Sequence, residues 1–167
     1  MNQKYFWENS VQHYVLIASN SGLRVGEQIQ LKWSDVKVEA HKDKTGEPVR
    51  LARIHVRAET SKVRTSRIFL RLNRHYFERW QATVGHSDRE NHIFSVNGVK
   101  SITKHSLLQH FKRMMELAGI PDRDKRDIVP YSLRHSMITQ RIMGGLDFRE
   151  IADMCRTSMG ADRARLL

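Results

Sequence analysis

The sequence predicts an α+β fold: a mostly helical domain with one small three-stranded antiparallel sheet near its front. Apolar residues recur at helical spacing in several segments, whereas residues 36–40 and 52–58 alternate between apolar and polar side chains. A chain of 167 residues with 40% hydrophobic residues is long enough to bury one core. We therefore expect a single domain over residues 1–167.

The front of the chain is expected to hold two helices. Apolar residues on one face predict the first helix over residues 9–20, and Ser21-Gly22 marks its end. A short helix is expected to follow Gly26 and to close around residues 31–33.

Three strands are expected next, because β-type alternation is bounded by turn residues. They cover residues 36–40, 52–58 and 67–70. One face of this sheet would enter the core. The opposite face would be strongly basic, because Arg53 and Arg57 alternate with the apolar residues of the second strand.

The second half of the chain is expected to be helical again. Asn73, Thr103 and Ser132 are placed to cap three helices, and Gly85 ends the first of them. Asp147 opens a last helix through a capping box. The clearest apolar stripe belongs to the helix after Thr103 and consists of Leu107, Leu108, Phe111, Met114, Met115 and Ala118.

The chain is strongly basic. Lys and Arg total 29 against 18 Asp and Glu, which gives a formal net charge of +11 and a pI of about 10.2. A domain with this charge attracts polyanions, of which nucleic acid is the commonest. The alternative is that the charge serves solubility alone.

Cysteine usage and hydropathy set further limits. A single cysteine, Cys155, excludes an internal disulfide framework and a cysteine-rich zinc site, and it fits a reducing compartment. The longest clean apolar run, residues 14–18, is too short to cross a bilayer, and no signal-peptide pattern opens the sequence. The acids of residues 122–127 alternate with bases, as in a solvated loop. We expect a cytoplasmic protein that uses no membrane, metal or cofactor.

Two arginines lie where a cation is disfavoured. Arg24 lies beside the start of the short helix, and Arg134 lies in the first turn of the helix that Ser132 would cap. The helix dipole presents partial positive charge at both places. Two such arginines indicate a shared anion, because guanidinium and backbone N–H groups together bind phosphate strongly.

Three segments resemble the conserved boxes of the tyrosine recombinases, the phage-integrase family. SGLRVGEQIQLKWSDV (residues 21–36) is similar to the first box, YSLRHSMIT (131–139) to the second, and LDFREIADMCRTS (146–158) to the segment leading into the third. The resemblance covers most of the chain. It implies the fold of the family's C-terminal catalytic domain, without the N-terminal core-binding and arm-binding domains. It also implies site-specific breakage and rejoining of DNA through a 3′-phosphotyrosyl intermediate.

The resemblance implies a role for each matching residue. In this family two arginines clamp the scissile phosphate, and they match Arg24 and Arg134, whose planar forks suit bidentate contacts. A lysine on the hairpin between two strands acts as general acid and matches Lys62; the alternative is a lysine that only positions phosphate. Glu27 follows Arg24 at the family spacing and would orient a neighbouring group.

Tyr131 stands where the second box of the family usually opens with histidine. A tyrosine hydroxyl donates to a phosphate oxygen but is a poor general base near neutral pH. The alternative is an aromatic side chain packed at the edge of the cleft. His135 matches a family position that supports the arginines, and its alternative role is a buried histidine bonded to the backbone.

The third box is degenerate. Its histidine or tryptophan position falls at Arg156 or Thr157, and the nucleophilic tyrosine would follow about nine residues later. The tyrosines of the chain are Tyr5, Tyr14, Tyr76 and Tyr131, none of which lies near that point. We therefore expect a chain that is truncated before the nucleophile, ends in foreign sequence or has decayed, and that binds DNA without forming a covalent adduct.

The sequence thus predicts a recombinase domain of a mobile element. Its partners would be double-stranded DNA at attachment or recombination sites and other recombinase protomers. The predicted DNA contacts are Arg53, Arg57, Arg64 and Arg67. A non-catalytic basic DNA-binding regulator is the alternative. A metal-dependent nuclease is disfavoured, because the histidines are scattered and no carboxylate pair has ligand spacing.

Overall fold

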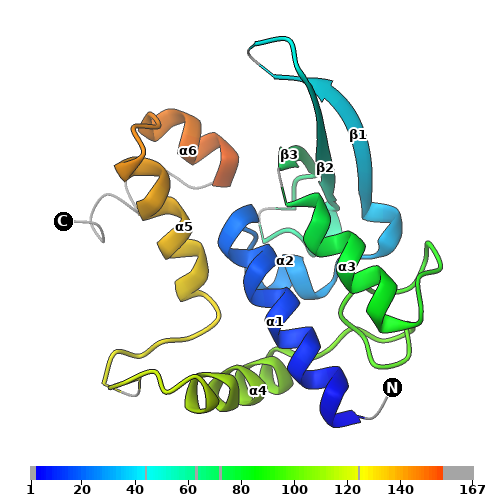
Figure 1. Cartoon of the computed structure of the whole chain (residues 1–167), viewed down its shortest axis with the longest axis vertical. Helices are drawn as coiled ribbons and strands as arrows, with labels where there is room; N and C mark the ends of the chain where they lie inside the picture. Colours follow the sequence, from blue (N-terminus) through cyan, green and yellow to red (C-terminus); the bar gives the residue numbers. More distant parts are fainter. Residues whose placement is uncertain (1–2, 44, 63, 72, 124, 156–167) are drawn as a thin grey trace.

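The fold combines six α-helices with one three-stranded sheet, in a computed structural model that describes residues 3–43, 45–62, 64–71, 73–123 and 125–155 (Figure 1). This confirms the predicted α+β class. The elements in chain order are α1 (Gln3–Ser21), α2 (Val25–Ile29), the 3-10 helix η1 (Trp33–Asp35), β1 (Val36–Lys42), β2 (Pro48–Val56), the 3-10 helix η2 (Ala58–Thr60), β3 (Arg67–Arg71), α3 (Arg74–Val84), α4 (Lys104–Leu117), α5 (Ser132–Met143) and α6 (Phe148–Cys155).

The sheet is antiparallel throughout, with strand order β1-β2-β3. Ile54 in the central strand pairs with Val36 on one side and with Phe69 on the other. Ala52, Ile54 and Val56 are buried, and the side chains between them are partly exposed, which confirms the predicted alternation as far as residue 56. The predicted strand end at residue 58 is wrong, because Ala58 begins η2. β1 and β2 form a long hairpin whose tip projects from the body of the molecule (Figure 1).

The first helix, α1, packs against α3, α4 and α5 and thereby organises the main core. It begins at Gln3, well before the predicted residue 9. The reason is Phe6, which is buried with its ring centroid 6.0 Å from that of Trp80. Trp80 is itself fully buried, and its indole N–H donates to the carbonyl oxygen of Ile93 at 2.7 Å.

The caps of α3 and α4 only partly follow the prediction. The Thr103 hydroxyl accepts the backbone N–H of Ser106 at 3.0 Å, as expected of an N-cap. Gly85 ends α3 with a left-handed φ of 75°, also as expected. Asn73 precedes α3, but its side chain makes no capping hydrogen bond.

The predicted cap of α5 is wrong. Ser132 is the first residue of the helix, and Tyr131 precedes it with helical backbone angles. The Ser132 hydroxyl instead accepts the backbone N–H of Val129 at 3.2 Å, which stabilises the turn leading into the helix.

Helices α5 and α6 form a second, smaller core beside the main one. Its buried members are Met137, Ile138, Ile151 and Cys155. The two cores meet at Gly22, directly after α1, where φ is +68° and the end of the Met137 side chain lies against the glycine. Glycine is favoured here by the left-handed φ, whereas the flexible Met137 side chain could move aside.

A buried ion pair joins α2 to β3. Glu27 is 1% exposed, and its carboxylate accepts from Nη1 and Nη2 of Arg67 at 2.9 and 2.6 Å. The same carboxylate accepts the backbone N–H of Arg24 at 2.9 Å. Burial alone would raise the pKa of Glu27, but the hydrogen bonds and charges of Arg67 and Arg24 outweigh it, so this pKa lies below its usual value.

Replacing Glu27 with Gln is expected to destabilise the fold by about 3–5 kcal/mol at neutral pH, because Arg67 stays buried without its carboxylate. The depressed folded-state pKa means that the stabilisation is complete above the unfolded pKa of about 4.3 and is lost as the pH falls through the folded pKa. Urea titrations should therefore show the difference in free energy of unfolding between the wild type and the variant shrinking in acid.

The matched control is Glu78→Gln, which removes a half-exposed i,i+4 pair with Arg74 (2.6 Å) on α3. That change should alter the free energy of unfolding by less than about 0.5 kcal/mol. A Glu27→Gln difference that stays constant from neutral pH into acid would contradict an ionised Glu27 as the source of the stabilisation.

Candidate nucleic-acid interface

Side chains from four separate segments line one open cleft of about 640 Å³. The segments are the start of α2, the connection between β2 and β3, the first turns of α4, and residues 129–131 before α5. The charged or polar groups that bear on function are Arg24, Lys62, Arg64, Lys104 and Tyr131. The fold thus brings the predicted residues Arg24, Lys62 and Tyr131 to one place.

The cleft carries a surplus of positive charge. Four of the lining side chains are cations, whereas the carboxylates are Glu27 and Glu59. Glu27 is already bound by Arg67, so its charge is largely offset from within the protein. An anion that enters the cleft is therefore attracted.

Arg24 precedes α2 with extended backbone angles, φ −68° and ψ 150°. Its side chain is 18% exposed, and Nη1 lies 3.3 Å from Oε1 of Glu27. Glu27 lies in the first turn of α2, so a negative charge offsets both the helix dipole and the guanidinium. This explains how a cation is stable at a helix start, while the remaining side of Arg24 lines the cleft.

Lys62 and Arg64 lie on the connection between β2 and β3, and both are exposed. Arg64 has a left-handed φ of 53°, and its backbone N–H donates to Ser61 at 3.1 Å. The connection therefore turns sharply around Lys62 and directs two cations to the same side. This placement agrees with the predicted hairpin tip.

Tyr131 is 37% exposed at the edge of the cleft. Its ring makes an edge-to-face contact with that of His135, with 4.7 Å between the centroids and 85° between the planes. His135 thus supports the tyrosine ring by packing, one helical turn away. The Tyr131 side chain remains accessible from the cleft.

Arg134 is only 2% exposed and does not line the cleft. Its Nη1 donates to the carbonyl of Gly22, and its Nη2 donates to the carbonyl of Cys155 at 2.6 Å. Gly22 follows the last residue of α1, and Cys155 is the last residue of α6. The guanidinium thus satisfies the carbonyl groups at two helix C-termini, where the dipole favours a cation.

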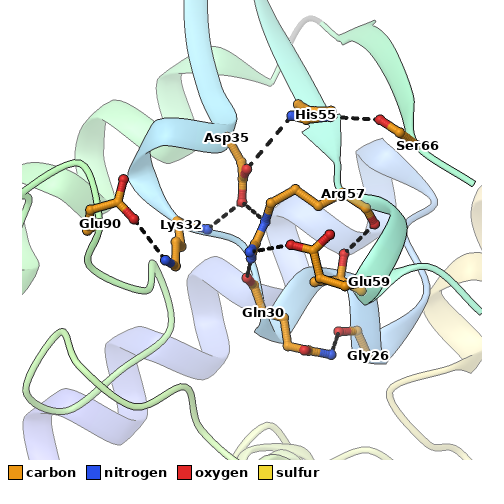
Figure 2. A network of polar contacts seen from close by, with 10 residues as sticks. Gly26, Gln30, Lys32, Asp35, His55, Arg57, Glu59, Ser66 and Glu90 are labelled. Atoms are coloured by element: carbon orange, nitrogen blue, oxygen red, sulfur yellow. Dashed lines mark hydrogen bonds and ion pairs between the residues drawn. The ribbon is translucent and has the colours of Figure 1, made fainter. Parts of the chain in front are cut away.

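Three of the four predicted DNA-contacting arginines are held in ion pairs. Arg67 binds Glu27 in the interior, Arg53 lies 3.5 Å from Glu39, and Arg57 lies 3.1 Å from Asp35 (Figure 2 shows the Arg57 contacts). Arg67 in particular is buried. Arg64 is the member of this set that lines the cleft.

The cleft is also lined by Lys104, Glu59 and Gln30, which were not predicted from the sequence. Lys104 had a detectable signal. It is the first residue of α4, directly after the cap Thr103, and so it is another cation at a helix start. Its Nζ lies 3.7 Å from where a Cβ on Gly26 would be, so the ammonium lies over the start of α2.

The remaining predictions concern the third box, a metal site and a membrane span. Arg156 and Thr157 of the third box lie outside the residues that the structure describes. Among the described residues, no cluster of three or more His, Cys, Asp or Glu side chains could hold a metal ion. The same part of the chain contains no helix long and apolar enough to span a membrane.

Three solved structures share this fold. The XerH site-specific recombinase bound to difH substrate, in a pre-cleavage complex, matches with a TM-score of 0.68 at 18% identity, over 98% of this chain and 44% of that chain. The Tn1549 transposon integrase in complex with transposon right end DNA matches with a TM-score of 0.65 at 11% identity, over 97% and 58%. A lambda integrase dimer bound to a COC′ core site matches with a TM-score of 0.58 at 12% identity, over 96% and 44%.

The chain therefore spans about half of the length of these structures, and the shared part has the fold of tyrosine-recombinase catalytic domains. No curated protein matches the chain significantly. The model of the phage integrase family matches residues 4–156, which is most of the sequence; it includes the first two predicted boxes and residues 146–156 of the third segment. The chain belongs to the phage integrase family.

Proposed function

We propose that the chain is the DNA-binding catalytic domain of a site-specific tyrosine recombinase and that its cleft receives a backbone phosphate of duplex DNA. One observation carries the proposal: Arg24, Lys62 and Tyr131, from three distant segments, line the same cationic cleft. A phosphodiester is the anion for which a guanidinium fork, an ammonium group and a hydroxyl are complementary.

The chemistry assigns a separate task to each group. The Arg24 guanidinium donates to the non-bridging oxygens and neutralises the charge that grows in the pentacoordinate transition state. Lys62 protonates the leaving 5′-oxygen, for which its position on an exposed turn gives the necessary reach. Tyr131 donates a hydrogen bond to a phosphate oxygen in place of the usual histidine.

Arg134 is proposed as the second arginine of the clamp, although its guanidinium binds two carbonyl groups in the DNA-free structure. A guanidinium has five N–H donors, so these two bonds do not exhaust it. Because Arg134 is buried, contact with phosphate requires the end of α6 to shift away from it. Until then, Arg134 keeps α5 against the segment that leads to Arg24.

The related structures support the proposed partners. XerH is bound to difH substrate, the Tn1549 integrase to a transposon end, and the lambda integrase is a dimer on a core site. By analogy, this chain would act on paired recombination sites of a mobile element, in the cytoplasm and together with further protomers.

Arg24→Ala and Lys62→Ala are each expected to weaken binding to duplex DNA. One phosphate contact adds a slope of about 0.9 to the dependence of log K on log salt, which is roughly eightfold in affinity between 0.1 and 1 M salt. Fluorescence anisotropy at several salt concentrations should therefore show the slope falling by about 0.9 for each variant.

Arg79→Ala on α3 is the control, because it removes one exposed positive charge outside the cleft. It should leave the slope unchanged. If Arg79→Ala lowers the slope as much as Lys62→Ala does, binding is a property of the whole basic surface, and the cleft proposal fails.

A second candidate function, DNA binding without strand cleavage, is favoured by the positions of the tyrosines. Tyr14 is 1% exposed, and burial raises the pKa of its hydroxyl, which makes it a poor nucleophile. Tyr131 occupies the place of the family's histidine in the second box. Tyr5 and Tyr76 do not line the cleft. We therefore expect that none of these tyrosines attacks phosphorus.

Incubating the chain with a nicked suicide duplex is expected to give no covalent protein–DNA adduct in a denaturing gel. The same substrate with an active tyrosine recombinase checks that the assay detects adducts. An adduct with this chain would contradict the expectation, and its loss in Tyr131→Phe would identify Tyr131 as the nucleophile.

A further inference from the structure

The Arg57 guanidinium uses all three of its nitrogens to hold separate parts of the chain together (Figure 2). Nε donates to Oδ2 of Asp35 at 3.1 Å, Nη1 to Oε1 of Glu59 at 2.9 Å, and Nη2 to the carbonyl oxygen of Gln30 at 2.7 Å. The side chain is 23% exposed. Each of the three nitrogens is therefore engaged with an acceptor inside the protein.

The acceptors of Arg57 are themselves fixed. Asp35 is 5% exposed, and it also accepts the backbone N–H of Lys32 at 2.9 Å. Gln30 follows the last residue of α2, and its side chain donates back to the carbonyl of Gly26 at 2.8 Å. Arg57 is therefore anchored to the rigid segment that begins with Arg24 and ends with η1.

Arg57 also shapes the turn that carries Lys62. It directly precedes η2, and its carbonyl oxygen accepts the hydroxyl of Thr60 at 3.0 Å. The same oxygen accepts the backbone N–H groups of Thr60 and Ser61 at 3.2 Å each. Lys62 follows directly, so the orientation of Arg57 sets where the lysine emerges into the cleft.

We propose that Arg57 is a positioning residue that fixes Lys62 relative to Arg24 across the phosphate-binding cleft. This inference rests on the proposed phosphate contact of Lys62. It replaces the predicted direct contact of Arg57 with DNA. The arginine fork is required, because a single lysine ammonium does not reach Asp35, Glu59 and the Gln30 carbonyl with separate, fixed donors.

The test is a double-mutant cycle between positions 57 and 62, read out as DNA affinity and salt slope. Arg57→Lys keeps the charge and removes the fork. With Lys62 present, Arg57→Lys should lose most of the salt slope of about 0.9 that Lys62→Ala loses. In the Lys62→Ala background, Arg57→Lys should change DNA affinity by less than about twofold, because Arg57 affects binding only by positioning Lys62.

Arg53→Lys is the matched control, since Arg53 lies on β2, four residues before Arg57, and pairs with Glu39 at 3.5 Å. Its effect should be small and equal in both backgrounds. Thermal melting of each variant separates loss of fold from loss of binding, and Arg57→Gln gives a second cycle should Arg57→Lys fold poorly.

The outcomes separate the two claims. An Arg57→Lys variant that binds like the wild type, or one that loses equal affinity with and without Lys62, overturns the positioning role while leaving the Lys62 contact intact. A Lys62→Ala variant with an unchanged salt slope overturns the phosphate contact itself, and the positioning role with it.

Discussion

The rest of the site depends on the hydrogen bonds that the buried carboxylate of Glu27 accepts. This carboxylate lies between two arginines and the backbone of Arg24, and it binds Arg67 through two hydrogen bonds. The negative charge of Glu27 in the first turn of α2 stabilises the Arg24 guanidinium at the start of that helix. The ion pair between Glu27 and Arg67 also binds this turn to the sheet. Glu27 therefore positions Arg24 and the sheet connection with one group.

Two further arginines repeat this principle with different acceptors. Arg57 joins the connection that bears Lys62 to the end of α2, and Arg134 joins the C-terminal ends of α1 and α6 through their carbonyl groups. Each of these guanidinium groups donates hydrogen bonds to several segments at once, because its N–H donors are held in a fixed planar arrangement. The cationic cleft is thus built on arginines that do not themselves face it. The cations that do face it are Arg24, Lys62, Arg64 and Lys104.

Much of the fold could be predicted, because it depends on local patterns: the alternation of β2, the Thr103 cap and the left-handed Gly85. The structural roles of the arginines could not be predicted from local patterns. Arg67 and Glu27 are 40 residues apart in sequence, so their pairing becomes visible only when the strand lies against α2. A count of charges cannot separate a paired guanidinium from one available to DNA. A cation at a helix start pointed to Arg24, which lines the cleft, and to Arg134, which is buried away from it; the same signal also fits Lys104, which lines the cleft.

The proposed site places one DNA phosphate between Arg24 and Lys62. A crystal structure of the chain bound to a short duplex would show whether a phosphate lies there. We expect a backbone phosphate with oxygens about 3 Å from both the Arg24 guanidinium and the Lys62 ammonium, and Arg57 still bound to Asp35. A duplex bound along another face, with no phosphate between Arg24 and Lys62, would contradict it.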